Sequence, residues 1–294
     1  ESLAGIEAFT NLINLNIEGY RGSDISPIAK LTKLDQLSIA WSCCRDAARD
    51  LTPLLGLKQL TKLNLNNANI KDIAVLRGLT NLRDLQIGWN QINNYSALAN
   101  LKQLRYLNLY SSQISSIPEL GATASLEQLE LGDNPITTLA GLPEIPSLRY
   151  MNLNNTQITD LSPLSGSQNL QNISARTARL QSLTLSNLPG LNQLELSDNQ
   201  ITSIVIDGVP NLHWIDLNNN RLTGFAGLEV ASNLSYLYLH NNLIRNVASI
   251  KPVLASTPLQ ELTLTSNEIS VLGDAFDAMS EGNLDLSGNP LLCD

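Results

Sequence analysis

Charged residues are few in this chain of 294 residues, and their balance excludes several classes of function. The chain has 18 Lys and Arg residues against 27 Asp and Glu residues, which gives a net charge of −9. Nucleic-acid binding depends on cationic contacts to phosphate, so this balance argues against a nucleic-acid partner. No apolar run approaches the ~18 residues that a membrane-spanning helix needs, so we predict no membrane insertion.

Residues suited to catalysis or metal binding are also scarce. The chain has only two histidines, His213 and His240, and no nucleophile elbow, phosphate-binding loop or zinc-protease motif accompanies them. Asp133 and Asp198 lie too far apart in the sequence pattern to share a metal ion, and no calcium-loop motif occurs. We therefore predict no catalytic residue, no metal, no cofactor and no small-molecule substrate.

Leucine is abundant instead, and it recurs with a spacing near 22 residues. Eight of the twelve steps between repeat starts are 22 residues, and the others are 26, 21, 21 and 25. A period in this range predicts a solenoid, in which stacked units bury one continuous core. Function is then expected on the surface that the repetition builds. The repeat starts are Leu12, Leu34, Leu60, Leu82, Leu104, Leu126, Leu148, Leu170, Leu191, Leu212, Leu234, Leu259 and Glu281.

Each unit reads Leu-x-x-Leu-x-Leu-x-x-Asn-x-Ile-x-x-Ile. The Leu-x-Leu alternation has period two and predicts a short strand whose leucines point into the core. Successive strands run in one direction, so the sheet is expected to be parallel. The Asn column follows the strand and is expected to bond the backbone of the turn. Weaker stability is predicted where other residues interrupt this column, at Tyr20, Ser42, Ala68, Ser112, Thr156 and Ala178.

Segments such as Asp24-Ile25-Ser26-Pro27-Ile28 follow the turn and predict one turn of 3₁₀ or α-helix, with proline near its start. Helical turns need more room per repeat than strands do. The sheet is therefore expected on the concave face and the helical turns on the convex face. Insertions lengthen two units, at 43–49 and 248–258, and the second insertion is expected to form a fuller helix.

The three cysteines predict no disulfide within the chain. Cys43 and Cys44 are adjacent, whereas Cys293 lies at least ten repeats away. At a strand spacing of ~4.8 Å this separation is roughly 50 Å, far beyond the ~7 Å between Cα atoms that a disulfide tolerates. Cys44 falls on an apolar core position and is expected to be a buried thiol.

The repeat resembles that of the leucine-rich repeat proteins, in the short subclass that includes bacterial internalins and intracellular phosphatase regulators. The resemblance covers nearly the whole chain and implies an α/β leucine-rich repeat solenoid. We expect a single array of about 13 units over residues 1–294, with a partial unit at the N-terminus. Residues 1–6 read as the second half of a unit whose strand is missing, as in a processed or truncated product. Residues 284–294 resemble the start of a cysteine-bearing C-terminal cap.

Aromatic residues are only 4% of the chain, yet they gather on the predicted outward strand positions. All three tryptophans and five of the seven tyrosines fall there, although Leu and Ile already fill the core. Such clustering indicates an interface, and the alternative is that large side chains merely cover a wide sheet. One predicted patch consists of Trp89, Tyr106 and Tyr110, and the other of Trp214, Tyr236, Tyr238 and His240. The complete set of predicted partner-binding residues is Trp89, Tyr106, Tyr110, Tyr150, Glu195, Asp198, Trp214, Asp216, Tyr236, Tyr238 and His240.

Acidic residues share these columns, so a protein partner with a basic or mixed apolar and basic surface is expected. The leading hypothesis is a non-enzymatic module that binds a protein on its concave face. The resemblance favours a secreted or bacterial cell-surface protein of the internalin type. Two alternatives stay open: an intracellular, cytoplasmic scaffold of the phosphatase-regulator type, and the targeting domain of a larger enzyme.

Overall fold

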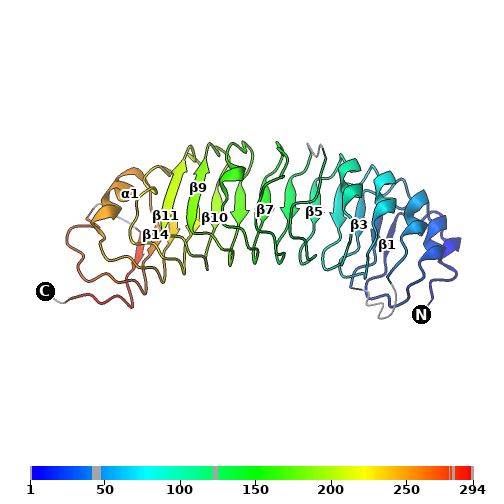
Figure 1. The fold of residues 1–294 in the computed structure, drawn as a ribbon, viewed down its shortest axis with the longest axis horizontal. Coiled ribbons are helices and arrows are strands. Elements are labelled where there is room, and N and C mark those ends of the chain that lie inside the picture. Colours follow the sequence, from blue (N-terminus) through cyan, green and yellow to red (C-terminus); the bar gives the residue numbers. More distant parts are fainter. Residues whose placement is uncertain (1, 42–47, 122–124, 278, 280–281, 293–294) are drawn as a thin grey trace. The chain divides into compact units, whose positions relative to one another are not determined.

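The computed structural model describes residues 2–41, 48–121, 125–277, 279 and 282–292 (Figure 1). The chain forms two compact units. The first unit consists of Glu1–Pro135 and Gly141–Leu148, and the second of Ile136–Ala140 and Arg149–Asp294. The predictions made for Ser42, Cys43, Cys44 and Cys293 lie outside the described residues.

The first unit contains six short parallel strands that pair in chain order, with 3₁₀ turns between most of them. The turns η2 and η3 pack against each other, as do η4 and η5. The strands are β1 (Asn14–Asn16), β2 (Gln36–Ser38), β3 (Lys62–Asn64), β4 (Asp84–Gln86), β5 (Tyr106–Asn108) and β6 (Gln128–Glu130). The turns are η1 (Ile6–Ala8), η2 (Ser26–Lys30), η3 (Thr52–Gly56), η4 (Ala74–Gly78) and η5 (Ser96–Asn100).

The second unit contains seven parallel strands of the same kind and a separate pair of strands. The seven strands are β7 (Tyr150–Asn152), β8 (Asn172–Ser174), β10 (Gln193–Glu195), β12 (Trp214–Asp216), β13 (Tyr236–Tyr238), β14 (Glu261–Thr263) and β15 (Asn283–Asp285). The separate pair is β9 (Ser182–Ser186) and β11 (Ser203–Asp207). The helical elements are η6 (Ser162–Leu164), η7 (Ala248–Ile250) and α1 (Lys251–Ser256).

The strand register confirms the predicted alternation of inward and outward residues. In β3, Leu63 is fully buried, whereas Lys62 on the same strand is exposed. Lys62 lies opposite Asp84 and Leu63 lies opposite Leu85, so equivalent repeat positions form columns. The fold is therefore the parallel-strand leucine-rich repeat architecture that the 22-residue period predicts.

The asparagine column satisfies buried backbone groups, as predicted. The side-chain oxygen of Asn90 accepts hydrogen bonds from the N–H groups of Ala68 and Ile70, at 3.2 and 2.9 Å. Its amide nitrogen donates to three carbonyl oxygens at 2.8–3.0 Å. Thr156 keeps one such bond, from its hydroxyl to the carbonyl of Leu153 at 2.7 Å. Three carbonyl contacts per side chain recur at Asn134, Asn199, Asn220, Asn242 and Asn267.

The predicted helical turns form where Asp precedes Ser or Thr and Pro. The carboxylates of Asp24, Asp50 and Asp160 accept the backbone N–H two residues further on, at 2.8, 2.9 and 2.8 Å. The insertion at 248–258 forms η7 and α1, which confirms the fuller helix predicted there. In the part of the chain that the structure describes, no helix has the length and hydropathy that crossing a membrane requires.

Two consecutive repeats replace the helical turn with a strand, which the sequence analysis did not predict. These are the two repeats of 21 residues, and they contribute β9 and β11. Ser203 lies opposite Ser182 in a parallel register, and the burial of successive residues alternates along both strands. One residue fewer and a β-branched Ile-Val-Ile run at 204–206 favour an extended conformation over a helical turn.

Candidate functional site

The candidate site is the strand face of each unit, defined here as the surface formed by the outward-pointing side chains of its parallel strands. Trp214 on β12 and Tyr236 and Tyr238 on β13 point outward and are partly exposed. Ile215 and Leu237, which lie between or beside them, are fully buried. The register on which the sequence prediction depends is therefore confirmed at these residues.

Trp214 and Tyr238 form the centre of a second-unit aromatic cluster, which also contains His213 and Tyr236. The ring centroids of Trp214 and Tyr238 lie 5.6 Å apart and their planes are tilted by 56°. Trp214 is also the register partner of Tyr236, whose hydroxyl donates to the side-chain oxygen of Gln260 at 3.1 Å. Aromatic rings at this separation attract one another in addition to burying area. The cluster is thus already ordered before any partner binds.

His213 belongs to this cluster, although the sequence analysis did not select it. Its ring meets that of Tyr236 edge to face, with centroids 5.2 Å apart. His213 precedes the strand β12 by one residue, so it lies at the edge of the strand face. The sequence signal was a histidine adjacent to the Trp214 column, which strand alternation alone assigns to the opposite side.

His240 and Tyr238 are held by polar contacts. The Nδ1 atom of His240 lies 2.6 Å from the hydroxyl oxygen of Thr265, and its backbone N–H donates to the side chain of Asn218 at 2.7 Å. Burial raises the pKa of Tyr238, and the charge of Glu261 raises it further. Tyr238 therefore keeps its proton at neutral pH and presents a hydroxyl donor to a partner.

The first unit carries its own cluster, which we call the first-unit aromatic cluster, formed by Trp41, Trp89 and Tyr110. The ring centroids of Trp41 and Trp89 lie 5.3 Å apart, and those of Trp89 and Tyr110 lie 4.9 Å apart. Trp41 is 51% exposed. Both tryptophans have φ of 55°, in the left-handed region, where Asn67 and Asp133 stand in other repeats. A bulky residue is rare in this conformation, and such strain is concentrated at functional sites.

The predicted first patch is corrected in its membership. Trp41 belongs to it, although the predicted set left it out, and Tyr106 points to a different neighbour. The hydroxyl of Tyr106 accepts a hydrogen bond from the amide of Asn108 at 3.3 Å, and burial raises the pKa of Tyr106. Tyr150 points outward from β7, and the strands β8 and β10 separate it from Trp214.

The acidic residues of the second unit are partly neutralised within the strand face. The guanidinium of Arg176 pairs with Glu195 at 3.1 Å and with Asp216 at 3.8 Å. Ser174 also donates to Glu195, at 2.7 Å. Asp216 is only 7% exposed, so its predicted role as a direct partner contact is corrected to that of an internal ion-pair residue. Asp198 remains exposed on this unit, where it accepts a hydrogen bond from the amide of Asn219.

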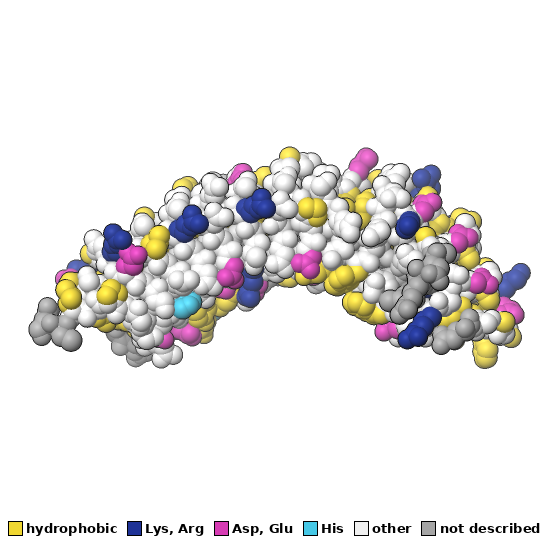
Figure 2. All heavy atoms as spheres, turned by 60° about the horizontal axis from the view of Figure 1, so that its bottom comes forward, with side chains coloured by type: hydrophobic (Ala, Val, Ile, Leu, Met, Phe, Trp, Pro, Cys, Tyr) yellow, Lys and Arg dark blue, Asp and Glu magenta, His cyan; other side chains and the backbone are white. Residues whose placement is uncertain are grey.

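Figure 2 shows the consequence for the surface. On the face drawn there, acidic and basic side chains are interspersed, and uncharged polar groups form most of the area. Among the described residues, no group of three or more His, Cys, Asp or Glu side chains is arranged to hold a metal ion.

The comparisons with known proteins agree with this architecture. Residues 118–220 match the family model described as the Endo-beta-N-acetylglucosaminidase EndoS LRR domain. An internalin of Listeria monocytogenes is 25% identical, with 96% of this chain and 76% of that chain covered and a TM-score of 0.72. Internalin C2 of Listeria monocytogenes is 32% identical, with 58% of this chain and 74% of that chain covered and a TM-score of 0.54.

A more distant structure shows the fold alone. The LRR ectodomain of a plant membrane receptor kinase from Arabidopsis thaliana, in complex with Casparian strip integrity factor 2, is 22% identical. The match covers 97% of this chain and 39% of that chain, with a TM-score of 0.67. No curated protein sequence matches the chain.

Parallel strands on one side, short turns on the other and a buried asparagine ladder define the class: the chain is a leucine-rich repeat protein. Within that class, it belongs to the internalin-like type, as its likeness to internalin C2 and to the longer internalin shows. Its fold neighbours suggest a module for protein–protein interaction.

Proposed function

We propose that the chain is a non-enzymatic recognition module that binds a protein partner through its strand faces. The observation that carries the proposal is the placement of Trp41, Trp89 and Trp214 on these faces, outside a core already filled by aliphatic residues. Tryptophan and tyrosine are the residues most enriched at interface hot spots. The strained backbone of Trp41 and Trp89 supports the same conclusion, because a small polar residue satisfies the turn in other repeats.

The second-unit aromatic cluster is the proposed main anchor. Trp214 and Tyr238 stack on each other, so they lose little conformational freedom when a partner covers them. Arg176 offers a cation beside the cluster, and Asp198 offers an exposed carboxylate. A partner with an apolar centre and a mixed rim that includes Lys or Arg fits this pattern.

The test is a quantitative pull-down with the chain as bait, followed by affinity measurement with the purified partner. The double variant Trp214→Ala/Tyr238→Ala is expected to weaken binding at least 30-fold, since one hot-spot residue contributes about 2 kcal/mol or more. The matched control is Val205→Ala, which removes an exposed apolar side chain of β11 that lies outside the strand face. Equal affinity of the double variant and the wild type would exclude the cluster as the anchor.

We also propose an extracellular or cell-surface location, which is supported by the internalin relatives and by the receptor ectodomain among the fold neighbours. Labelling of intact cells with an antibody against the chain tests it. Signal from intact cells supports the proposal, and signal only after permeabilisation contradicts it and favours the cytoplasmic scaffold instead.

A second candidate function is favoured by one specific observation. The match over 118–220 is to the LRR domain of an endo-β-N-acetylglucosaminidase, so a chain of this type also serves beside a catalytic domain. In that case, the strand face would position a larger enzyme on its substrate protein. The Trp214→Ala/Tyr238→Ala variant would then raise KM for the protein substrate and leave hydrolysis of a free glycan unchanged.

A further inference from the structure

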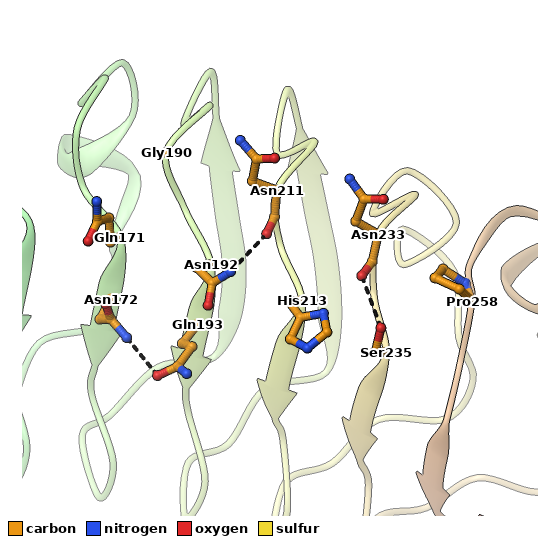
Figure 3. A pocket seen from close by; sticks show the side chains of 10 residues that line it. All are labelled: Gln171, Asn172, Gly190, Asn192, Gln193, Asn211, His213, Asn233, Ser235 and Pro258. Carbon is orange, nitrogen blue, oxygen red and sulfur yellow. Dashed lines mark hydrogen bonds between the residues drawn. The ribbon is translucent and has the colours of Figure 1, made fainter. Parts of the chain in front are cut away.

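The second unit contains a hollow at the edge of its strand face, where the chain enters β8, β10, β12 and β13 (Figure 3). Its volume is about 780 Å³. Six amide side chains line it, together with His213 and Ser235, and no Lys, Arg, Asp or Glu does. The amides are Gln171, Asn172, Asn192, Gln193, Asn211 and Asn233.

Internal hydrogen bonds orient these amides and leave part of each group available. The amide nitrogens of Asn211 and Asn233 donate to the carbonyls of Pro189 and Pro210, at 2.7 and 2.6 Å. Among the described residues, the side-chain oxygens of Asn211 and Asn233 accept no hydrogen bond. These oxygens are therefore fixed acceptors that a ligand hydroxyl satisfies without further ordering of the protein.

Donors stand beside these acceptors. The amide of Asn172 donates to the side-chain oxygen of Gln193 at 2.6 Å, which leaves the amide nitrogen of Gln193 as a donor. The amide nitrogen of Asn192 makes only a long contact of 3.4 Å to the carbonyl of Asn211. Vicinal hydroxyls donate and accept at once, so a mixed array of amide donors and acceptors is complementary to them.

The lining is a local departure from the rest of the repeat. The position after the first leucine of a repeat is mostly charged earlier in the chain, with Ile13 and Thr61 as exceptions, and it is uncharged through five consecutive repeats from Gln171 onward. The earlier members are Asp35, Arg83, Arg105, Glu127 and Arg149. The later members are Gln171, Asn192, His213, Ser235 and Gln260.

A chain with a net charge of −9 thus presents a stretch without charge. Absence of cations in the lining disfavours phosphate, sulfate and carboxylate ligands, which charge-assisted bonds recognise. Peptide grooves rely on apolar pockets for side chains, and Pro258 is the one apolar side chain among the lining residues. The ring of His213, edge to face with Tyr236, offers a flat surface for the C–H face of a sugar and a ring nitrogen for a hydroxyl.

We propose that this hollow binds a neutral oligosaccharide. The amides recur once per repeat, at the strand spacing of ~4.8 Å, which is close to the distance between successive rings of an extended β-linked saccharide. A hollow of this size lies within the range of ligand sites of ~300–1,000 Å³. This inference concerns a surface separate from the aromatic anchor, so its failure leaves the protein-binding proposal standing.

The test is titration calorimetry of the whole chain with defined probes at millimolar concentration. The probes are neutral hexasaccharides of β-linked glucose, of β-linked N-acetylglucosamine and of mannose. A sialylated oligosaccharide, a sulfated oligosaccharide and a glycine- and serine-rich peptide form the comparison arms. We expect at least one neutral hexasaccharide to bind more tightly than all three comparison probes.

Two variants connect binding to the hollow. Asn192→Ala/His213→Ala is expected to weaken the bound hexasaccharide by about tenfold or more, as lost hydrogen bonds of ordinary strength predict. Gln171→Glu adds a charge without removing volume and is expected to weaken it as well. The matched control Arg105→Ala changes the equivalent position of the first unit and is expected to bind as the wild type does, and circular dichroism checks that each variant folds.

Three outcomes would overturn the proposal. One is that no neutral hexasaccharide binds, and another is that the peptide or an anionic saccharide binds more tightly than every neutral one. The third is that the folded Asn192→Ala/His213→Ala and Gln171→Glu variants bind as the wild type does.

Discussion

Single asparagines do much of the structural work in this protein. Asn90 is 3% exposed and satisfies two N–H groups and three carbonyl groups that its turn would otherwise bury without partners. The cost of an unsatisfied buried polar group is about 1–3 kcal/mol, so one side chain controls several such penalties at once.

This accounting makes Asn90→Ala a strongly destabilising change. We expect the free energy of unfolding to fall by about 3 kcal/mol or more, measured by urea denaturation, because backbone groups of two repeats lose their partner. The control is Asn93→Ala, an exposed asparagine three residues away, which is expected to change stability by less than about 0.5 kcal/mol. Equal effects of the two substitutions would show that the ladder is not a source of stability.

At the scale of the element, the strands and the short turns were predictable, and their contacts were only partly so. Alternating leucines determine which residues of β12 point outward, so Trp214 was placed correctly. The strands β9 and β11 were missed because one missing residue in a 21-residue repeat changes a turn into an extended segment. Trp41 was missed because its ring reaches over Asn67 to Trp89, a side-chain direction that a repeat pattern does not contain.

The ion pairs of Arg176 were unpredictable for the same reason. The sequence places Arg176, Glu195 and Asp216 in neighbouring columns, but only side-chain geometry decides whether the carboxylates face a partner or each other's cation. The acidic character expected from composition is therefore weaker on this part of the second unit than the count of carboxylates suggests.

The 3₁₀ turns carry a pH dependence. The hydroxyl of Thr52 lowers the pKa of the Asp50 carboxyl, and the Thr52 backbone N–H lowers it further. A carboxyl whose folded pKa lies below its unfolded value stabilises the fold above the unfolded pKa of ~3.9, and this contribution disappears as the pH falls through the folded pKa.

We therefore expect the melting temperature of the wild type to fall more steeply below about pH 5 than that of Asp50→Asn, which keeps an acceptor oxygen but does not titrate. Thr52→Val removes the hydroxyl donor and is expected to flatten the same part of the profile. Thermal melts followed by circular dichroism between pH 2 and pH 7 measure both. Parallel profiles for all three proteins would contradict this assignment.

At the scale of the whole molecule, charge and apolar contact are expected to act on different steps of partner binding. The net charge of −9 acts at long range and steers a basic partner toward the chain. The stacked pair Trp214 and Tyr238 acts only after contact, when water leaves the rings. Exposed carboxylates such as Asp198 belong to the first step, since an exposed charge contributes little to a bound complex.

This separation gives a kinetic prediction for the partner recovered with the chain. The association rate is expected to fall as NaCl rises from about 50 to 500 mM, because the Debye length shortens from about 14 to 4 Å. Asp198→Asn should lower the association rate at low salt and leave the dissociation rate unchanged, whereas Trp214→Ala should mainly raise the dissociation rate. Surface plasmon resonance separates the two rates. An association rate that does not respond to salt would show that the acidic charge has no part in recognition, and a Trp214→Ala variant with an unchanged dissociation rate would place the anchor elsewhere on the molecule.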